Sequence, residues 1–315
     1  MPHPSAGKVT VQTYAEGWQR IQVSSEGTRR IVDNALRLHI LPTLGGHWLA
    51  AVRRSHVQAL VKELEGKGLA AGTVRNIYEV AARVFDAAAE DRVISSSPCR
   101  RITLPKSDGG EVVPPTLAEI EDVRTKLDGR WKVIPLVLAG SGLRIGELLG
   151  LGVYDVDYLR REIRVERQRL QSGEIAPLKS KTSRRTVPVG QVVIDALTAH
   201  LSAFPGTDDA PFADEFSEPL TYRRRKRLWR DAASAARVNA TSHDLRHFAA
   251  SALISGGASV KQVQTFLGHA SAVITLRTYA HMFPGDEDRT RNVLDAALSP
   301  AALADSVGTE AASND

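Results

Sequence analysis

Four short segments carry side chains whose types and spacing are suited to chemistry. Two of them are Ser141–Leu149 (SGLRIGELL) and Leu178–Pro188 (LKSKTSRRTVP). The third is His243–His247 (HDLRH). The fourth begins at Leu267–His269 (LGH) and is followed, ten residues beyond His269, by Tyr279. Arginine, lysine, histidine and tyrosine therefore gather in a few places, and together they suggest more than any one segment does.

The two histidines of the third segment need a separate explanation first. His243 and His247 are four residues apart, which is also a metal-ligand spacing on a helix. A zinc protease needs glutamate at the second position of this motif, where the chain has Asp244. Arg246 beside the pair would repel a dication. We therefore predict no metal site, and a simple surface or core histidine pair is the default unless other segments point here.

Exchange of a phosphodiester without a metal has clear requirements. The attacking hydroxyl must be able to stay attached to phosphorus, and tyrosine offers one with a pKa of about 10. Two arginines can grip the charged nonbridging oxygens. A lysine can protonate the departing sugar oxygen, and a histidine can accept the tyrosine proton. The chain supplies this set as Arg144, Arg246, His243, His269, a lysine of the second segment and Tyr279.

These segments resemble the signature boxes of the tyrosine recombinase (phage integrase) family. The resemblance extends from about Thr116 to Phe283, and the boxes occur in the family's order. The preceding hundred residues resemble the family's core-binding domain more weakly, through His39–Gly45 (HILPTLG), the Gly-Leu pair before Thr73, and Ser97-Pro98. We thus expect a site-specific DNA recombinase that cuts and rejoins DNA.

The resemblance implies a role for each matching residue. Arg144 and Arg246 would clamp the scissile phosphate, and Tyr279 would attack it to form a 3′-phosphotyrosine and free a 5′-hydroxyl. His243 would act as acid or base, and His269 would hydrogen-bond the phosphate or the leaving oxygen.

Two further residues are expected to support the catalytic ones. Glu147 matches the acidic position of the first box, where it would buttress the arginine region, although an exposed helix residue is an alternative. His247 is expected beside the catalytic residues rather than among them.

The resemblance also implies a general acid, a lysine at the end of the second strand, where the hairpin turns. Lys179 fits best because Lys179-Ser180-Lys181 is similar to the family's common Lys-Thr-Lys, and Lys181 is the competitor.

Several other cations are candidates for contacts with DNA. The segment 222–230 packs six cations around two aromatics and a leucine. A solvated helix face or hairpin edge is the alternative in each case. The candidates are Lys181, Arg184, Arg185, Arg223 and Arg224.

The elements that must position these residues are mostly helical. Residues 10–104 show helical spacing throughout, with a helix capped by Thr28 that ends before Pro42, and others at 57–64 and from Thr73. Prolines and glycines mark 105–115 as a linker. After it, residues 116–303 predict helices, among them one capped by Thr116, and a small antiparallel sheet.

Three strands are expected in that sheet, at 162–165, 175–179 and 185–189, the last two joined by a turn at 180–183. The fold class is therefore mainly α with a small antiparallel sheet, in two domains. Residues 1–9 and 304–315 are expected to be tails.

Composition sets the remaining limits. The chain of 315 residues is 43% hydrophobic and 24% charged, which is typical of a globular protein, and carries a net charge of +5. Cys99 is its one cysteine, so it has no internal disulfide and a reducing compartment is indicated. With no membrane span or signal peptide in the sequence, we expect a protein of the bacterial cytoplasm, at the nucleoid.

The expected partner is double-stranded DNA carrying attachment sites, with no membrane and no ATP, metal or other cofactor. By resemblance, the helix expected at 288–303 packs on a neighbouring protomer in a tetrameric synapse, or else on its own domain. Accessory DNA-bending or directionality proteins would act on the same sites. An arm-binding domain is not expected, because only about ten residues precede the first helices. The alternatives are a relaxing topoisomerase with the same chemistry and a DNA-binding regulator with a decayed site.

Overall fold

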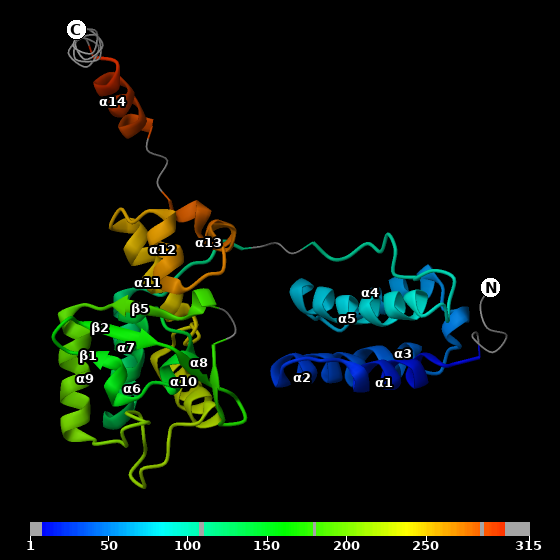
Figure 1. Cartoon of the computed structure of the whole chain (residues 1–315), viewed down its shortest axis with the longest axis horizontal. Helices are drawn as coiled ribbons and strands as arrows, with labels where there is room; N and C mark the ends of the chain where they lie inside the picture. The colour runs from blue at the N-terminus through cyan, green and yellow to red at the C-terminus, as the bar shows by residue number, and fades with distance from the viewer. Residues whose placement is uncertain (1–7, 107–109, 179–180, 284–286, 300–315) are drawn as a thin grey trace, which may run out of the picture. The chain divides into compact units, whose positions relative to one another are not determined.

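The computed structural model describes residues 8–106, 110–178, 181–283 and 287–299. The chain divides into two compact units, Met1–Gly110 and Glu111–Asp315 (Figure 1). In the described part of the chain, no helix has the length and apolar content to cross a membrane.

Across residues 8–106, the first unit is built from helices and the segments that join them, apart from one isolated bridge between Thr10 and Trp48. Its elements are α1 (Val11–Ile21), α2 (Glu26–Ala35), the π-helical turn η1 (Leu36–Ile40), α3 (Leu41–Leu44), the 3-10 turn η2 (Leu49–Ala51), α4 (Arg54–Gly66) and α5 (Ala71–Glu90).

The start predicted for the helix before Pro42 was wrong. Ser25 caps α2 by accepting a hydrogen bond from the Thr28 backbone, so the helix begins before Thr28. The chain also stays helical through Pro42, because this proline lies in the first turn of α3, where its missing N–H has no helical partner to lose. The π-helical turn η1 joins the two helices.

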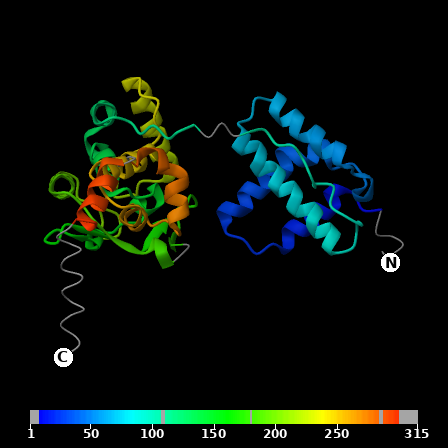
Figure 2. The same ribbon diagram turned by 90° about the horizontal axis from the view of Figure 1, so that it is seen from above.

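The apolar faces of these helices form one core. On α4 it includes Leu60 and Leu64, and on α5 it includes Val84 and Phe85, all of them nearly or fully buried. The views in Figure 1 and Figure 2 show α5 over the blue helices α1 and α2, with which it is in contact. These two inner faces follow the predicted spacing of three and four residues.

The second unit begins with a helix whose cap the sequence predicts. Thr116 accepts from the Glu119 backbone and Glu119 accepts from Thr116, a reciprocal capping box. The longer helices are α6 (Leu117–Lys126), α7 (Val133–Ser141), α8 (Ile145–Leu149), α9 (Gln191–Ala203), α10 (Tyr222–Ala236), α11 (Asp244–Ser255), α12 (Val260–Leu267), α13 (Ala272–Tyr279) and α14 (Glu287–Ala297). The short 3-10 turns are η3 (Gly129–Trp131), η4 (Val153–Asp155), η5 (Lys181–Ser183) and η6 (Ala280–Met282).

The strands pair differently from the prediction. A three-stranded antiparallel sheet has the order β1-β2-β5, from Val156–Asp157, Glu162–Val165 and Arg185–Pro188, with Ile163 opposite Val187. The strands β3 (Arg167–Arg169) and β4 (Ile175–Pro177) form a separate antiparallel pair. The expected hairpin between 175–179 and 185–189 is therefore wrong.

A tight turn explains the different pairing. Gly173 has a φ of 97°, in the left-handed region that glycine tolerates, and the Leu170 N–H donates to the Glu174 carbonyl at 2.7 Å. This turn closes β3 on β4 before the chain reaches β5. β5 then pairs with β2 instead.

The second unit has a main core and a smaller one. The main core lies between the sheet and helices α6 to α10, around residues such as Leu138, Leu148 and Ile163. The smaller cluster joins α11, α12 and α13 through Ile254, Leu267 and Tyr279. This mainly helical architecture with small antiparallel sheets confirms the predicted fold class.

Candidate active site

A left-handed glycine places the first arginine. Gly142 ends α7 with a φ of 59°, and a Cβ there would lie 2.8 Å from the Phe266 ring. Only glycine fits this turn, which reverses the chain so that Arg144 begins α8 as its cap residue. The Arg144 guanidinium donates to the Gly268 carbonyl at 3.3 Å, and 39% of its side chain is exposed.

The carboxylate of Glu147 forms ion pairs with two arginines, Arg144 and Arg185. Its side chain is 1% exposed, and its two oxygens lie 2.7 Å from Arg144 Nη1 and 3.0 Å from Arg185 Nη2. Burial alone would raise the pKa of this carboxyl, but the hydrogen bonds and charges of Arg185 and Arg144 outweigh burial and lower it below its ordinary value. Glu147 is thus an ionised buttress, as the resemblance implied.

Arg185 corrects a prediction. The sequence suggested a phosphate contact or a solvated hairpin edge, but the Arg185 side chain is only 5% exposed. Besides the ion pair with Glu147, it donates through Nε to the Phe266 carbonyl at 2.7 Å and through Nη1 to the Ser183 carbonyl at 3.0 Å. Its guanidinium is therefore committed to holding β5 against α8 and α12.

The second arginine of the site lies in the first turn of α11. Arg246 is 3% exposed, and it donates to the backbone carbonyls of Gly142 and Leu267. Burial, followed by the charge of Arg144, lowers the pKa of Arg246 to about 9, which still leaves the guanidinium charged near neutral pH. The two carbonyls orient the guanidinium and leave its remaining donors for another acceptor.

The histidine at the start of α11 lies at the surface. His243 is exposed on one side, while its ring meets the His247 ring edge-on with 5.1 Å between centroids. Desolvation where it packs, then the neighbouring His247 and Arg246, lower the pKa of His243, so it is neutral at pH 7.

A second left-handed glycine places the third histidine. Gly268 ends α12 with a φ of 65°, and His269 follows with its Nδ1 2.9 Å from the Thr275 hydroxyl. Thr275 is fully buried. Burial, then the charges of Arg246 and Arg144, lower the pKa of His269 to about 4. Neutral His269 is therefore oriented by Thr275.

The tyrosine ends α13. Tyr279 is 1% exposed, and its hydroxyl lies 2.8 Å from Nδ1 of His247. Its ring is nearly parallel to the His269 ring, with 6.5 Å between centroids and an interplanar angle of 10°. Burial raises the pKa of this phenol, and the charge of Arg246 opposes that rise in part. The hydroxyl thus carries its proton at neutral pH.

These side chains converge on one pocket of about 360 Å³. They come from the turn before α8, from α11, from the turn after α12 and from the end of α13. The pocket is lined by Arg144, Ser183, His243, Arg246, His247, Gly268, His269, Ala270, Ile274, Thr278 and Tyr279. Two fixed positive charges beside a phenol make it suited to a phosphodiester.

The other residues predicted for catalysis or DNA contact do not line this pocket, or they lie outside the residues that the structure describes. Lys179 lies outside the described residues, and Lys181 begins the 3-10 turn η5. Arg184 and Arg223 are exposed. Arg224 instead pairs with Asp214 and lies over the Trp131 ring, 5.5 Å from its centroid.

The sequence did not single out Ser183 or Thr275, although both belong to the site. Thr275 lies six residues beyond His269 and Ser183 lies in a turn, so neither spacing carries a signal of its own.

As for a metal centre, within the described ranges no three histidine, cysteine or acidic side chains gather to hold an ion.

The model of the phage integrase family matches residues 112–285, more than half of the chain. The chain belongs to the phage integrase family. It is also similar to the integrase of Mycobacterium phage L5, at 26% identity over 87% of this chain and 76% of that protein.

Two solved structures share the fold. One is the Tn1549 transposon integrase in complex with transposon right end DNA, with a TM-score of 0.80, 24% identity and coverage of 92% of this chain and 100% of that one. The other is a lambda integrase tetramer bound to a Holliday junction, with a TM-score of 0.70, 17% identity and coverage of 85% and 80%.

The predicted family and the enzyme class of tyrosine site-specific recombinases are thus confirmed. The relatives do not favour the topoisomerase or the inactive regulator.

Proposed function

We propose that this recombinase cleaves and rejoins double-stranded DNA at attachment sites through a covalent 3′-phosphotyrosine at Tyr279. The observation that carries the proposal is the convergence of Arg144, Arg246, His269 and Tyr279 on one pocket, although up to 135 positions separate them in the chain. Contacts between sequence neighbours alone do not bring residues so distant together. Their positive charges, beside a hydroxyl nucleophile, suit a phosphoryl transfer.

The chemistry follows from the geometry. A phosphate in the pocket would accept from the two arginines, whose permanent charges stabilise the extra negative charge of the transition state. Since Glu147 and backbone carbonyls already orient both guanidinium groups, little reorganisation is needed when substrate binds. His269, held by Thr275, would donate to a nonbridging or leaving oxygen, and His243 would assist at the pocket's exposed edge.

The leaving 5′-oxygen needs a proton. We propose Lys179 as its donor, with Lys181 as the alternative, because both follow β4 in the segment that leads to Ser183 at the pocket. One phosphodiester is exchanged for another of similar energy, so the reaction needs no ATP. The fixed arginine charges take the electrostatic role that a metal has in other phosphoryl transfers.

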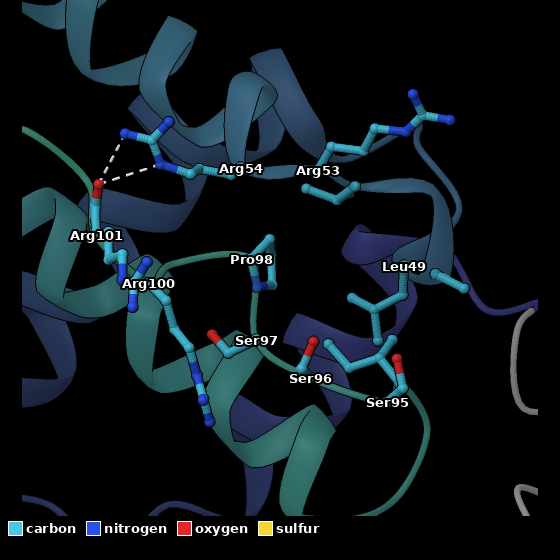
Figure 3. Close-up of a pocket in the computed structure, with 12 residues that line it drawn as sticks. Leu49, Arg53, Arg54, Ser95, Ser96, Ser97, Pro98, Arg100 and Arg101 are labelled. Carbon is cyan, nitrogen blue, oxygen red and sulfur yellow. Dashed lines mark hydrogen bonds between the residues drawn. The ribbon is translucent and has the colours of Figure 1, made fainter.

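We propose that the helical unit, within residues 10–104, is a core-binding domain that holds the duplex. A pocket of about 460 Å³ there is lined by Arg53, Arg54, Arg100, Arg101 and three serines, without any acidic side chain (Figure 3). Arg54 donates twice to the Arg101 carbonyl, which fixes the turn that carries Arg100. Such a rigid cationic surface suits phosphate contacts that position DNA. Arg184 and Arg223 are proposed as further contacts.

Assembly on DNA follows from a similar argument. The lambda integrase forms a tetramer on a Holliday junction, and we propose a tetrameric synapse for this chain as well. Leu294 on α14 and Leu298 just after it are 54% and 66% exposed, which supports a contact of this end of the chain with a neighbouring protomer. Accessory DNA-bending or directionality proteins and action at the nucleoid belong to the same proposal.

A nicked attachment site tests the proposal. Cleavage beside the nick lets the short fragment that carries the freed 5′-hydroxyl diffuse away, so the covalent complex accumulates and can be resolved by denaturing electrophoresis. We expect wild-type protein to form it in EDTA, and Tyr279→Phe to bind the same DNA without forming it. An adduct with the phenylalanine variant would contradict the assignment of the nucleophile.

A further inference from the structure

The hydroxyl of Tyr279 has one hydrogen-bond partner among the described residues, Nδ1 of His247 at 2.8 Å. We propose that His247 is the general base that takes the phenolic proton as the oxygen attacks phosphorus. This inference rests on the proposed function and assigns a reacting role to a histidine expected only to support the others. It would also make the second histidine of the HDLRH segment a catalytic residue.

The protonation states suit this transfer. Burial, then the charge of Arg246, lowers the pKa of His247 although Asp244 opposes this, so the imidazole is neutral near pH 7. A neutral imidazole protonated at Nε2 offers its Nδ1 lone pair to the phenol. Burial raises the pKa of Tyr279, so the phenol does not ionise unaided at that pH. A base in contact with its oxygen is therefore needed.

The other two histidines are less well placed for this step. Nδ1 of His269 is engaged with Thr275, and the His269 ring lies parallel to Tyr279 rather than end-on to its hydroxyl. His243 meets His247 edge-on and is exposed. This order, from buried Tyr279 through half-buried His247 to exposed His243, gives the proton a way out to solvent.

Substrate binding strengthens the base. The charged or titratable groups that surround His247 are Arg144, His243, Asp244, Arg246, His269 and Tyr279. Before DNA binds, burial is the main cause that holds the pKa of His247 down, while the charges of Asp244 and Arg246 act in opposite directions. A phosphate entering the pocket adds negative charge and favours the imidazolium, which raises the basicity of His247 when it is needed.

The step is balanced in atoms and charge. The phenolic O–H bond breaks as N–H forms at His247 Nδ1, and the P–O bond to Tyr279 forms as the P–O bond to the 5′-carbon's oxygen breaks. That oxygen takes a proton from the proposed lysine. In strand joining the imidazolium of His247 returns its proton to the departing phenolate, since the same groups must act in reverse.

The informative variant is His247→Asn, because the asparagine side chain keeps an acceptor near the place of Nδ1 but cannot take a proton. Single-turnover cleavage of a nicked site would be followed from pH 5.5 to 9. The wild-type rate should rise with pH and level off as His247 loses its proton. The variant should be slower at pH 7 by about 10²–10⁴-fold and keep rising toward alkaline pH.

The matched control is His281→Asn. His281 is exposed and lies two residues beyond the tyrosine. Its Nε2 lies 3.2 Å from the Val112 carbonyl, outside the pocket, so replacing His281 should leave the rate within twofold. DNA binding by both variants should equal that of the wild type, which separates a defect in chemistry from one in folding or binding.

A second substrate distinguishes a base from an acid. When sulfur replaces the leaving 5′-oxygen, the thiolate departs without a proton, because a thiol pKa is only about 8.5. His247→Asn should remain slow on this substrate. The proposal would be overturned if His247→Asn recovered the wild-type rate on the sulfur substrate, or if its pH profile equalled that of the wild type. It would also be overturned if the variant cleaved DNA faster than the wild type because Tyr279 had lost its hydrogen bond to His247. The wild-type adduct and its loss in Tyr279→Phe test the proposed function separately.

Discussion

The carboxylate of Glu147 and the guanidinium of Arg185 form a buried ion pair, 3.0 Å from Arg185 Nη2 to Glu147 Oε2, across 38 positions of the chain. The same carboxylate holds Arg144. The pair therefore fastens strand β5 to the helix that presents the first arginine of the pocket, and it links the stability of the second unit to the geometry of its site.

Loss of this carboxylate should destabilise the protein. Glu147→Gln would leave the guanidinium of Arg185 buried without its counter-charge, which costs about 3–5 kcal/mol for a buried pair. The free energy of unfolding in denaturant measures the cost. Glu121→Gln is the matched control, since its pair with Arg124 is solvent-exposed and should change stability by less than about 1 kcal/mol. Equal effects of the two variants would contradict a structural role for Glu147.

Stability should also depend on His269 in a defined pH window. Its pKa is about 6.5 when unfolded and about 4 in the fold, so between these values the unfolded chain binds more protons. Stability should fall as the pH drops from about 6.5 to 4, and the fall should be smaller in His269→Asn. Denaturant unfolding at pH 7 and pH 4.5 gives the comparison. The same loss in both proteins would show that His269 does not contribute.

Orientation of His269 depends on a threonine that bears no charge. Thr275→Val removes the hydroxyl at 2.9 Å from Nδ1 while preserving the size of the buried side chain. Removal of a hydrogen bond of about 1 kcal/mol should slow cleavage by roughly fivefold to tenfold. Thr198→Val, which removes a hydroxyl that donates to the Ile194 carbonyl on α9, away from the pocket, should cleave at nearly the wild-type rate. The ratio of these two rates is the informative measurement.

The arginine-lined pocket of the helical unit should contribute to binding through charge. In the double variant Arg53→Ala/Arg100→Ala, the dependence of log affinity on log salt should become shallower by about one for each phosphate that is no longer neutralised. Fluorescence anisotropy over a range of salt concentrations measures this slope. Arg20→Ala/Arg37→Ala removes two cations of the same unit outside the pocket and serves as the control. An unchanged slope in the first double variant would exclude phosphate binding there.

Local patterns in the sequence predict much of this molecule. The capping box of Thr116 and Glu119 and the inner faces of α4 and α5 depend on neighbours three or four residues away, and these are correct. The short, ordered boxes around Arg144 and Tyr279 led to the family because their residue types are chemically specific.

The errors concern contacts between distant segments. Strand β4 turned out to pair with β3 because of the turn at Gly173, whereas periodicity alone does not choose a partner strand. The sequence predicted Arg185 to be a surface cation, because its counter-charge Glu147 lies in α8, far away in the sequence. Helix α1 lies in the stretch predicted to be helical, but its bounds were not predicted, although Val11, Ala15 and Trp18 show helical spacing.

The central claim is that Tyr279 becomes covalently joined to DNA. The most direct measurement is mass spectrometry of the trapped protein–DNA complex after protease and nuclease digestion. We predict that a nucleotide 3′-phosphate is found on the peptide containing Tyr279, with a free 5′-hydroxyl on the released strand. A nucleotide attached to any other residue, or a 5′-phosphate linkage, would contradict the account.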